Sequence, residues 1–374
     1  MLVRIGGEVK NYPWGSKNLI QDHFGLGLAD REVAEVWFGT HDGGESKVQE
    51  SNQSLSEAIG SKLSFLVKFL AAQSPLSIQV HPNSVQAKEG FAKENAAGIS
   101  LTAAERNYKD DSHKPEILIA ITAFEALCGF RPKAQVLEIF LAFSESEPRF
   151  GELAALAATD ASVEEIFMEL MEDRALAERF SKSVESLDSD SIAETARLLT
   201  VGLLEKYPGD TGALVALLLN HIELTPGEAI FLPAGNLHAY LSGLGLEVMA
   251  ASDNVIRGGL TTKHIDKAEL SRITDFSELG NPVVATKKLA EGLIEYPVSA
   301  SEFRVYRAQI TGTNLLADLD LPAGAVVVCV NGEIAIGTSL EEREVLKKGE
   351  VAFVSQAKKF SLSGSGEAFM VLGS

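Results

Sequence analysis

Short apolar runs punctuated by glycine and proline flank a long block of different composition, and this division limits the folds that the chain can adopt. Residues 1 to about 130, and 214 to 374, contain the short runs, which predict β-strands. Residues 134–212 are rich in Ala, Leu and Glu and predict four or five helices. We therefore expect a mainly β chain that carries an α-helical insert domain.

Local signals mark the helices of the insert. Ser162 with Glu165, and Ser191 with Glu194, have the spacing of a capping box, in which each side chain bonds the backbone N–H of the other residue. Pro208-Gly209-Asp210 then predicts the end of the last helix.

The C-terminal region has a turn signal of its own. Residues 325–330 and 333–336 are apolar runs on either side of Asn331-Gly332. An Asn-Gly pair can fill both positive-φ positions of a type I′ turn, so we expect a hairpin here and a second small barrel around it. The expected domains are residues 1–133 plus 213–289 for the first β region, 134–212 for the insert and 290–374 for the C-terminal region.

The charge of the chain limits its partners. The formal net charge is −19, and such an acidic surface repels nucleic acid and anionic membranes. No apolar stretch reaches the roughly 18 residues of a membrane span, and the first residues lack the apolar core of a signal peptide. Cys128 and Cys329 are too few for a disulfide framework. We expect a monomer in the reducing cytoplasm that binds a small molecule.

The histidines are confined to one part of the chain, at or before His264. Imidazole is the commonest side chain for metal binding and acid–base work at neutral pH. We therefore place any such site in the first β region and expect a metal-free C-terminal domain. The seven histidines are His23, His41, His81, His113, His221, His238 and His264.

Two segments of the first β region put polar groups on strands. Gln79 and His81 share a strand face because they are two residues apart, and Pro82 ends that strand. In His113-Lys114-Pro115-Glu116, the cation and the carboxylate share a face and His113 takes the other. Each segment also has a simpler interpretation, a polar edge strand for the first and a plain ion pair for the second.

A third segment has a more specific spacing. Gly227 is followed by Pro233, Gly235 and His238, so that a strand ends, turns and re-enters with a histidine at its start. This pattern resembles the second motif of the cupin fold, a jelly-roll barrel. A tight turn with an incidental histidine is the alternative. The resemblance implies two cupin barrels, of which the first is interrupted by the helical insert.

The chain also resembles the type I mannose-6-phosphate isomerase family over residues 1 to about 265, because its motifs occur in one order around the insert. They are Asn11-Tyr12-Pro13-Trp14-Gly15, Glu35-Val36-Trp37, Ser77-Ile78-Gln79-Val80-His81-Pro82, Asn107-Tyr108 ahead of His113-Lys114-Pro115-Glu116, Pro233-Ala234-Gly235-Asn236-Leu237-His238-Ala239-Tyr240, and Ser252-Asp253-Asn254-Val255-Ile256-Arg257-Gly258-Gly259-Leu260-Thr261.

This resemblance implies one Zn²⁺ per chain and the interconversion of mannose 6-phosphate and fructose 6-phosphate through a cis-enediol or enediolate. Two oxygens and two imidazoles suit Zn²⁺, although Mn²⁺, Co²⁺ or Fe²⁺ would also accept them. The implied metal ligands are Gln79, His81, Glu116 and His238.

Other residues are candidates for the reaction itself. Arg257 precedes two glycines and is the expected cation for an enediolate. The base stays open between Asp253, His113, Lys114 and Glu247. For substrate binding we expect Ser77, Lys263, Trp14 and Tyr12. Departures from the family pattern are Ser242, Thr262 and Ser355.

Two other functions fit part of these patterns. A cupin dioxygenase or decarboxylase would use a redox metal, but Gln79 stands where such enzymes usually have a first histidine. A non-catalytic sugar-phosphate-binding bicupin would not need Arg257 and Lys114 beside a full ligand set. Both alternatives predict no turnover of the sugar phosphate.

Overall fold

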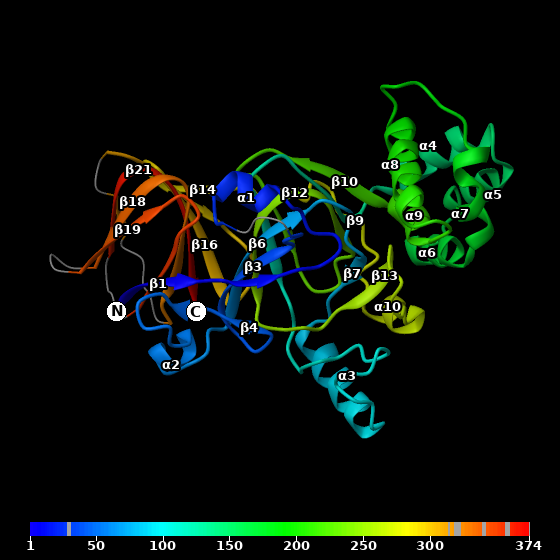
Figure 1. The fold of residues 1–374 in the computed structure, drawn as a ribbon. Coiled ribbons are helices and arrows are strands. Elements are labelled where there is room, and N and C mark those ends of the chain that lie inside the picture. The colour runs from blue at the N-terminus through cyan, green and yellow to red at the C-terminus, as the bar shows by residue number, and fades with distance from the viewer. Residues whose placement is uncertain (28–30, 313–314, 318–322, 339–341, 356–359, 374) are drawn as a thin grey trace.

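The computed structural model describes residues 1–27, 31–312, 315–317, 323–338, 342–355 and 360–373. The chain is mainly β, and its described strands form two large sheets (Figure 1). The first sheet contains β2 (Glu8–Lys10), β3 (Glu35–His41), β4 (Gly44–Glu45), β6 (Phe65–Ala72), β7 (Ile78–Val80), β8 (Glu116–Ala120), β9 (Phe124–Phe130), β10 (Leu219–Leu224), β11 (Ala229–Leu232), β12 (His238–Ala250) and β13 (Ile256–Gly259). The second contains β1 (Leu2–Gly6), β5 (Lys47–Val48), β14 (Lys287–Ala290), β15 (Leu293–Tyr296), β16 (Phe303–Thr311), β17 (Leu315–Ala317), β18 (Ala325–Gly337), β19 (Arg343–Lys347), β20 (Val351–Val354) and β21 (Phe360–Gly373).

Strand β12 organises the first sheet. Its first residues pair with β7 and β9, and its second half pairs with β6 and β8. A register shift between Tyr240 and Ser242 marks the change, as expected where a bulge lets a strand bend from one layer into another. Strand β12 therefore joins β7 and β9 to β6 and β8. Within the described residues the pairings of each sheet form no closed ring.

The first strand of the chain lies in the second sheet. Strand β1 pairs with β20 on one side and β5 on the other, both antiparallel. Leu2 faces Val354 and Ile5 faces Val351 in this register. The domain bounds expected from the sequence place this segment in the first β region, because the apolar alternation of a strand does not say which strand it pairs with.

The expected hairpin at Asn331-Gly332 is wrong. Both residues lie inside the long strand β18, which pairs with β21 on either side of them. Gly332 has a φ of 69°, but Asn331 is not among the residues with positive φ, so no type I′ turn forms. A register shift between Cys329 and Asn331 takes up the irregularity, so the Asn-Gly pair forms a bulge in a continuous strand.

Helices follow one another between β9 and β10 and gather at one end of the molecule (Figure 1). Ser162 forms the expected capping box with Glu165, and Ser191 caps its helix by accepting from the Glu194 N–H. None of the helices in the described part of the chain has the length and hydropathy needed to cross a bilayer. The helices are α1 (Leu19–Phe24), α2 (Leu55–Ile59), α3 (Ser84–Ala96), α4 (Lys133–Ser144), α5 (Pro148–Ala157), α6 (Val163–Glu172), α7 (Arg174–Ser183), α8 (Ile192–Lys206), α9 (Gly212–Val215), the 3₁₀ helix η1 (Ala216–Leu218) and α10 (Lys267–Ile273).

The two sheets share a hydrophobic core. Phe69 and Ile117 of the first sheet belong to the same buried cluster as Val326 and Phe353 of the second. Burial of apolar area is the main stabilising term in folding, so this shared core couples the stability of the two sheets.

Candidate active site

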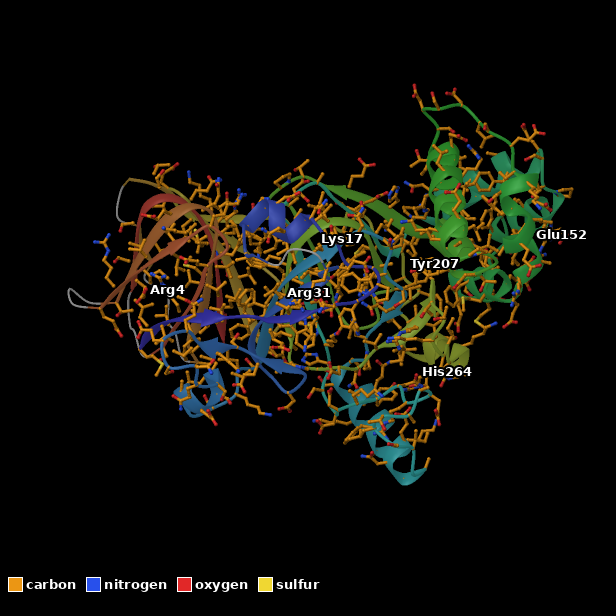
Figure 2. The ribbon with its side chains drawn as sticks, in the orientation of Figure 1. Arg4, Lys17, Arg31, Glu152, Tyr207 and His264 are labelled. Carbon is orange, nitrogen blue, oxygen red and sulfur yellow. The ribbon has the colours of Figure 1, made fainter. Side chains whose placement is uncertain are left out.

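A polar cavity of about 390 Å³ opens in the first sheet. Residues far apart in the sequence line it, because β6, β7, β8, β12 and β13 all contribute to its walls. Tyr207, which follows α8, lines one side of the cavity, where the helices between β9 and β10 meet the strands of the first sheet (Figure 2). Ten residues expected from the sequence line this cavity, namely Tyr12, Trp14, Ser77, Gln79, Lys114, Glu116, Glu247, Asp253, Arg257 and Lys263.

A buried cluster of three metal-binding side chains lies behind the cavity wall formed by Glu116. His81 follows β7, Glu116 opens β8 and His238 opens β12, so each stands at the end of a strand. The Glu116 Oε2 atom lies 3.4 Å from His81 Nε2 and 3.5 Å from His238 Nε2. All three side chains are at most 1% exposed. Their ligand atoms lie within 4.8 Å of one another, which is close enough to share one metal ion.

Two atoms of this cluster lack a hydrogen bond. His81 Nε2 and Glu116 Oε2 are buried and have no partner among the described residues. Such atoms are rare in folded proteins because each costs about 1–3 kcal/mol. Since they face each other across the position that a shared ion would take, the donor set fits a divalent metal. This fit rests on the residues of this chain alone.

Backbone carbonyls orient both imidazole rings. His81 Nδ1 lies 2.7 Å from the Asn254 carbonyl oxygen, and His238 Nδ1 lies 3.0 Å from that of Asn236. Each Nδ1–H donates to its carbonyl, which leaves Nε2 as the free ligand atom of each ring. The Gln79 amide lies 3.4 Å from His238 Nε2, and a half-turn about its Cγ–Cδ bond would present its oxygen to the cluster.

The cluster is held in the protonation states that a metal requires. Burial lowers the pKa of His81 to about 4, so the ring is neutral at pH 7. Burial opposes ionisation of Glu116, but the charge of Lys114 is the largest of the contacts that outweigh it, so the pKa of that carboxyl lies well below its usual value. Lys114 Nζ lies 2.9 Å from Glu116 Oε1, the oxygen that does not face the histidines.

Sequence reasoning missed a second polar network in the same cavity. The buried Lys68 Nζ lies 2.8 Å from Glu247 and 3.5 Å from Glu35. Tyr240 donates its O–H to Glu247 at 2.8 Å, and Trp37 donates its indole N–H to Glu35 at 2.8 Å. The available signal was a lysine in the middle of the apolar strand β6, where an unpaired charge would be too costly to bury.

Arg257 and Lys263 form the cationic side of the cavity. In the register of β13 on β7, Arg257 stands directly opposite Gln79, and opposed side chains of paired strands are neighbours. Burial lowers the pKa of Arg257, and burial with the Arg257 charge lowers the pKa of Lys263. No carboxylate lies within 4 Å of either cation among the described residues, so both can take an anion.

The remaining expected residues divide into two groups. Asp253 lines the cavity with its side chain 55% exposed and lies 3.6 Å from His41, and the Tyr12 and Trp14 rings stack at 5.5 Å. His113 is not among the lining residues, because its Nε2 lies 2.5 Å from Glu302.

Two departures from the family pattern can also be placed. Ser242 lies away from the metal-binding cluster and donates to Glu125 at 3.1 Å. Thr262 lines the cavity beside Lys263, so a hydroxyl stands where the family pattern has proline.

The fold and the site first define a class of protein. It is a mainly β candidate metalloenzyme, in which two histidines and one carboxylate form a cluster beside a polar cavity. Comparison with known proteins then gives the family. Residues 2–133 match the model of the phosphomannose isomerase type I catalytic domain. The chain is 36% identical to the mannose-6-phosphate isomerase of Escherichia coli (strain K12), with 94% of both chains covered.

More distant relatives agree. The mannose-6-phosphate isomerase of Homo sapiens is 31% identical, with 89% of this chain and 86% of that one covered. A crystal structure of mannose 6-phosphate isomerase bound with zinc and yttrium matches with a TM-score of 0.88 at 33% identity, covering 100% of this chain and 99% of that one. The chain therefore belongs to the type I mannose-6-phosphate isomerase family.

Proposed function

We propose that this protein is a zinc-dependent isomerase that interconverts mannose 6-phosphate and fructose 6-phosphate. The observation that carries the proposal is the buried cluster, in which His81 Nε2 and Glu116 Oε2 lack partners beside a polar cavity. The zinc-bound relative and the family membership support the choice of metal and substrate.

The proposed metal ligands are Gln79, His81, Glu116 and His238. When bound there, Zn²⁺ would polarise the oxygens of the sugar as a Lewis acid. Lys114 would hold Glu116 in place through its 2.9 Å contact and add positive charge where the enediolate forms.

Substrate binding would depend on the cationic side of the cavity. Arg257 and Lys263 would bind the substrate's negative charge, either the phosphate or the developing enediolate, with the Ser77 hydroxyl as a further donor. Tyr12 and Trp14 would cover the sugar, because their stacked rings offer an apolar face at the mouth of the cavity. With a net charge of −19, the protein must gather these cations locally to bind an anion.

The isomerisation itself moves one proton. A base takes the proton from C2 of the open-chain aldose and returns it to C1, while the O2 proton moves to O1. Asp253 is the proposed base, because both Glu247 oxygens are engaged by Lys68 and Tyr240. Burial lowers the pKa of His41, so this neighbour stays neutral and leaves the Asp253 carboxylate unpaired.

Replacing the base tests this assignment. Asp253→Asn is expected to lower kcat by about 10²–10⁴-fold, because an amide cannot accept the C2 proton. Zinc content and KM should change little. Asp42→Asn is the matched control, since Asp42 is an exposed acid of the neighbouring turn. A kcat within twofold of the wild type in Asp253→Asn would assign the base to another group.

The architecture that we propose follows the family. Each sheet would form a cupin sandwich, residues 134–212 would be a helical insert, and residues 290–374 a metal-free domain. The protein would act as a cytoplasmic monomer in carbohydrate metabolism, without nucleic-acid or membrane partners. Its acidic surface supports the last point.

A coupled assay with metal analysis tests the function. Zinc-loaded protein is expected to convert mannose 6-phosphate to fructose 6-phosphate, to lose this activity with its zinc on chelation, and to regain it on zinc addition. Glu116→Gln and His238→Ala should bind zinc at least about tenfold more weakly. Folded, zinc-replete protein without turnover would reject the isomerase, and oxygen consumption by an iron-loaded form would favour a dioxygenase.

A further inference from the structure

A buried arginine lies outside the catalytic cavity without a counter-charge. Arg131 follows β9 and is 4% exposed, yet no carboxylate lies within ion-pair distance among the described residues. Its Nε and Nη2 atoms both donate to the Leu219 carbonyl oxygen, at 2.8 Å and 2.6 Å. A buried cation normally has an anionic partner, because desolvation of an unpaired charge is costly.

The environment of Arg131 contains little negative charge. Burial is the resolved cause that lowers its pKa, to about 10, so the guanidinium stays charged at pH 7. Acids on neighbouring elements are already engaged, and Glu278, which bridges Phe130, accepts from the Lys133 N–H at 3.0 Å. Glu125 lies 2.6 Å from His221, and Glu194 pairs with Arg197 at 2.7 Å.

Arg131 lines a small cavity between α4, α8 and β10, with a volume of about 150 Å³. Gln135, Thr195, Asn220 and His221 are its other polar lining residues, and no carboxylate is among them. The Gln135 side-chain amide forms no hydrogen bond with the described residues, so its N–H groups are available. At roughly 30 Å³ per water, the space equals about five waters and admits a tetrahedral oxyanion.

Helix α8 adds to the positive potential of this cavity. Ile192 and Thr195 in its first turn line the wall, and the N-terminal end of a helix carries partial positive charge. The other end of α8 leads to Tyr207 at the catalytic cavity (Figure 2). At 1.5 Å per residue, its 15 residues separate the two cavities by roughly 22 Å.

We propose that the cavity at Arg131 is a second anion site, which takes inorganic phosphate or the terminal phosphoryl group of a phosphorylated metabolite. The guanidinium supplies the charge, and the Gln135 amide supplies a further donor. This site is separate from the proposed substrate site and does not depend on the isomerase activity.

Gln135→Glu tests the site without disturbing Arg131 or its bonds to Leu219. The new carboxylate would stand in the first turn of α4, where a negative charge is favourable, and would pair with Arg131 in place of the ligand. Gln53→Glu is the matched control, because it makes the same charge change at an exposed loop residue. Phosphate binding to the zinc-loaded protein is measured by calorimetry and equilibrium dialysis.

Wild type and Gln53→Glu are expected to bind one more phosphate per chain than Gln135→Glu, whose affinity at this site falls at least about tenfold. Arg131→Met should lose the same binding event. A parallel titration with glycerol 3-phosphate distinguishes free phosphate from a phosphomonoester. Equal stoichiometry and affinity in Gln135→Glu and Gln53→Glu, with both folded by circular dichroism, would overturn the proposal.

Discussion

At the scale of single residues, the candidate metal site consists of polar side chains that are buried away from water. His81, Glu116 and His238 are almost completely buried, and each occupies the end of a strand. Their lone pairs converge on one point because carbonyl oxygens of Asn254 and Asn236 fix both rings. This arrangement is unfavourable for an empty protein and favourable for one that holds a cation.

The buried His81 makes the metal-free protein sensitive to acid. Its folded-state pKa of about 4 lies below the ordinary value of 6.5, so the unfolded chain binds more protons between these two values. Its contribution to stability is therefore present above pH 6.5 and lost as the pH falls towards 4. We expect metal-free wild type to lose about 2 kcal/mol more unfolding free energy between pH 7 and pH 5 than His81→Gln.

Urea unfolding of both proteins at the two pH values measures this difference. His221→Gln is a suitable control, because it removes a partly exposed histidine outside the cluster. Parallel losses in wild type and His81→Gln would mean that His81 titrates as it does in the unfolded chain.

At the scale of elements, sequence patterns identified the strands that carry the site, but not which strands pair. Period-two spacing located Gln79 and His81, and the turn at Gly235 located the start of β12. The Asn331-Gly332 signal failed because the long partner β21 stays paired with β18 through those residues. Lys68 was missed because its partners, Glu35 and Glu247, come from other strands. Ion pairs between residues far apart in the sequence leave no pattern in the sequence around either partner.

Two helical glycines illustrate how contacts override helix propensity. A Cβ on Gly90 in α3 would lie 2.3 Å from the buried Tyr108 ring, whereas one on Gly202 in α8 would meet nothing within 4 Å. Alanine in a helix is favoured over glycine by about 0.5–1 kcal/mol. We expect Gly202→Ala to stabilise the protein by about that amount, and Gly90→Ala to destabilise it by about 1–3 kcal/mol through overpacking.

Thermal unfolding of the two variants, compared with the wild type, measures both effects. The opposite signs are the informative result. If Gly90→Ala were also stabilising, Tyr108 and α3 would have to move apart easily, and the close contact would have no structural importance.

At the scale of the whole molecule, the two sheets should unfold together. Ile5 of the second sheet is 1% exposed and packs in the core that both sheets share. Ile5→Ala should cost about 2–5 kcal/mol. The two tryptophans, Trp14 and Trp37, belong to the first β region and report on its unfolding by fluorescence.

If the sheets are coupled, the tryptophan transition of Ile5→Ala shifts to lower urea together with the transition seen by circular dichroism. A tryptophan transition that stays at the wild-type midpoint would show that the two sheets unfold independently. Lys17→Ala, an exposed change in the first β region, serves as the control.

The pairing of β1 with β20 has a consequence for biosynthesis. Val354 and Val351, which face Leu2 and Ile5, are synthesised about 350 residues after them. At about 5–20 residues per second, the amino-terminal strand waits on the order of tens of seconds for its partner. During that time its apolar side chains are open to chaperones, and the native sheet is complete only after β20 has been synthesised.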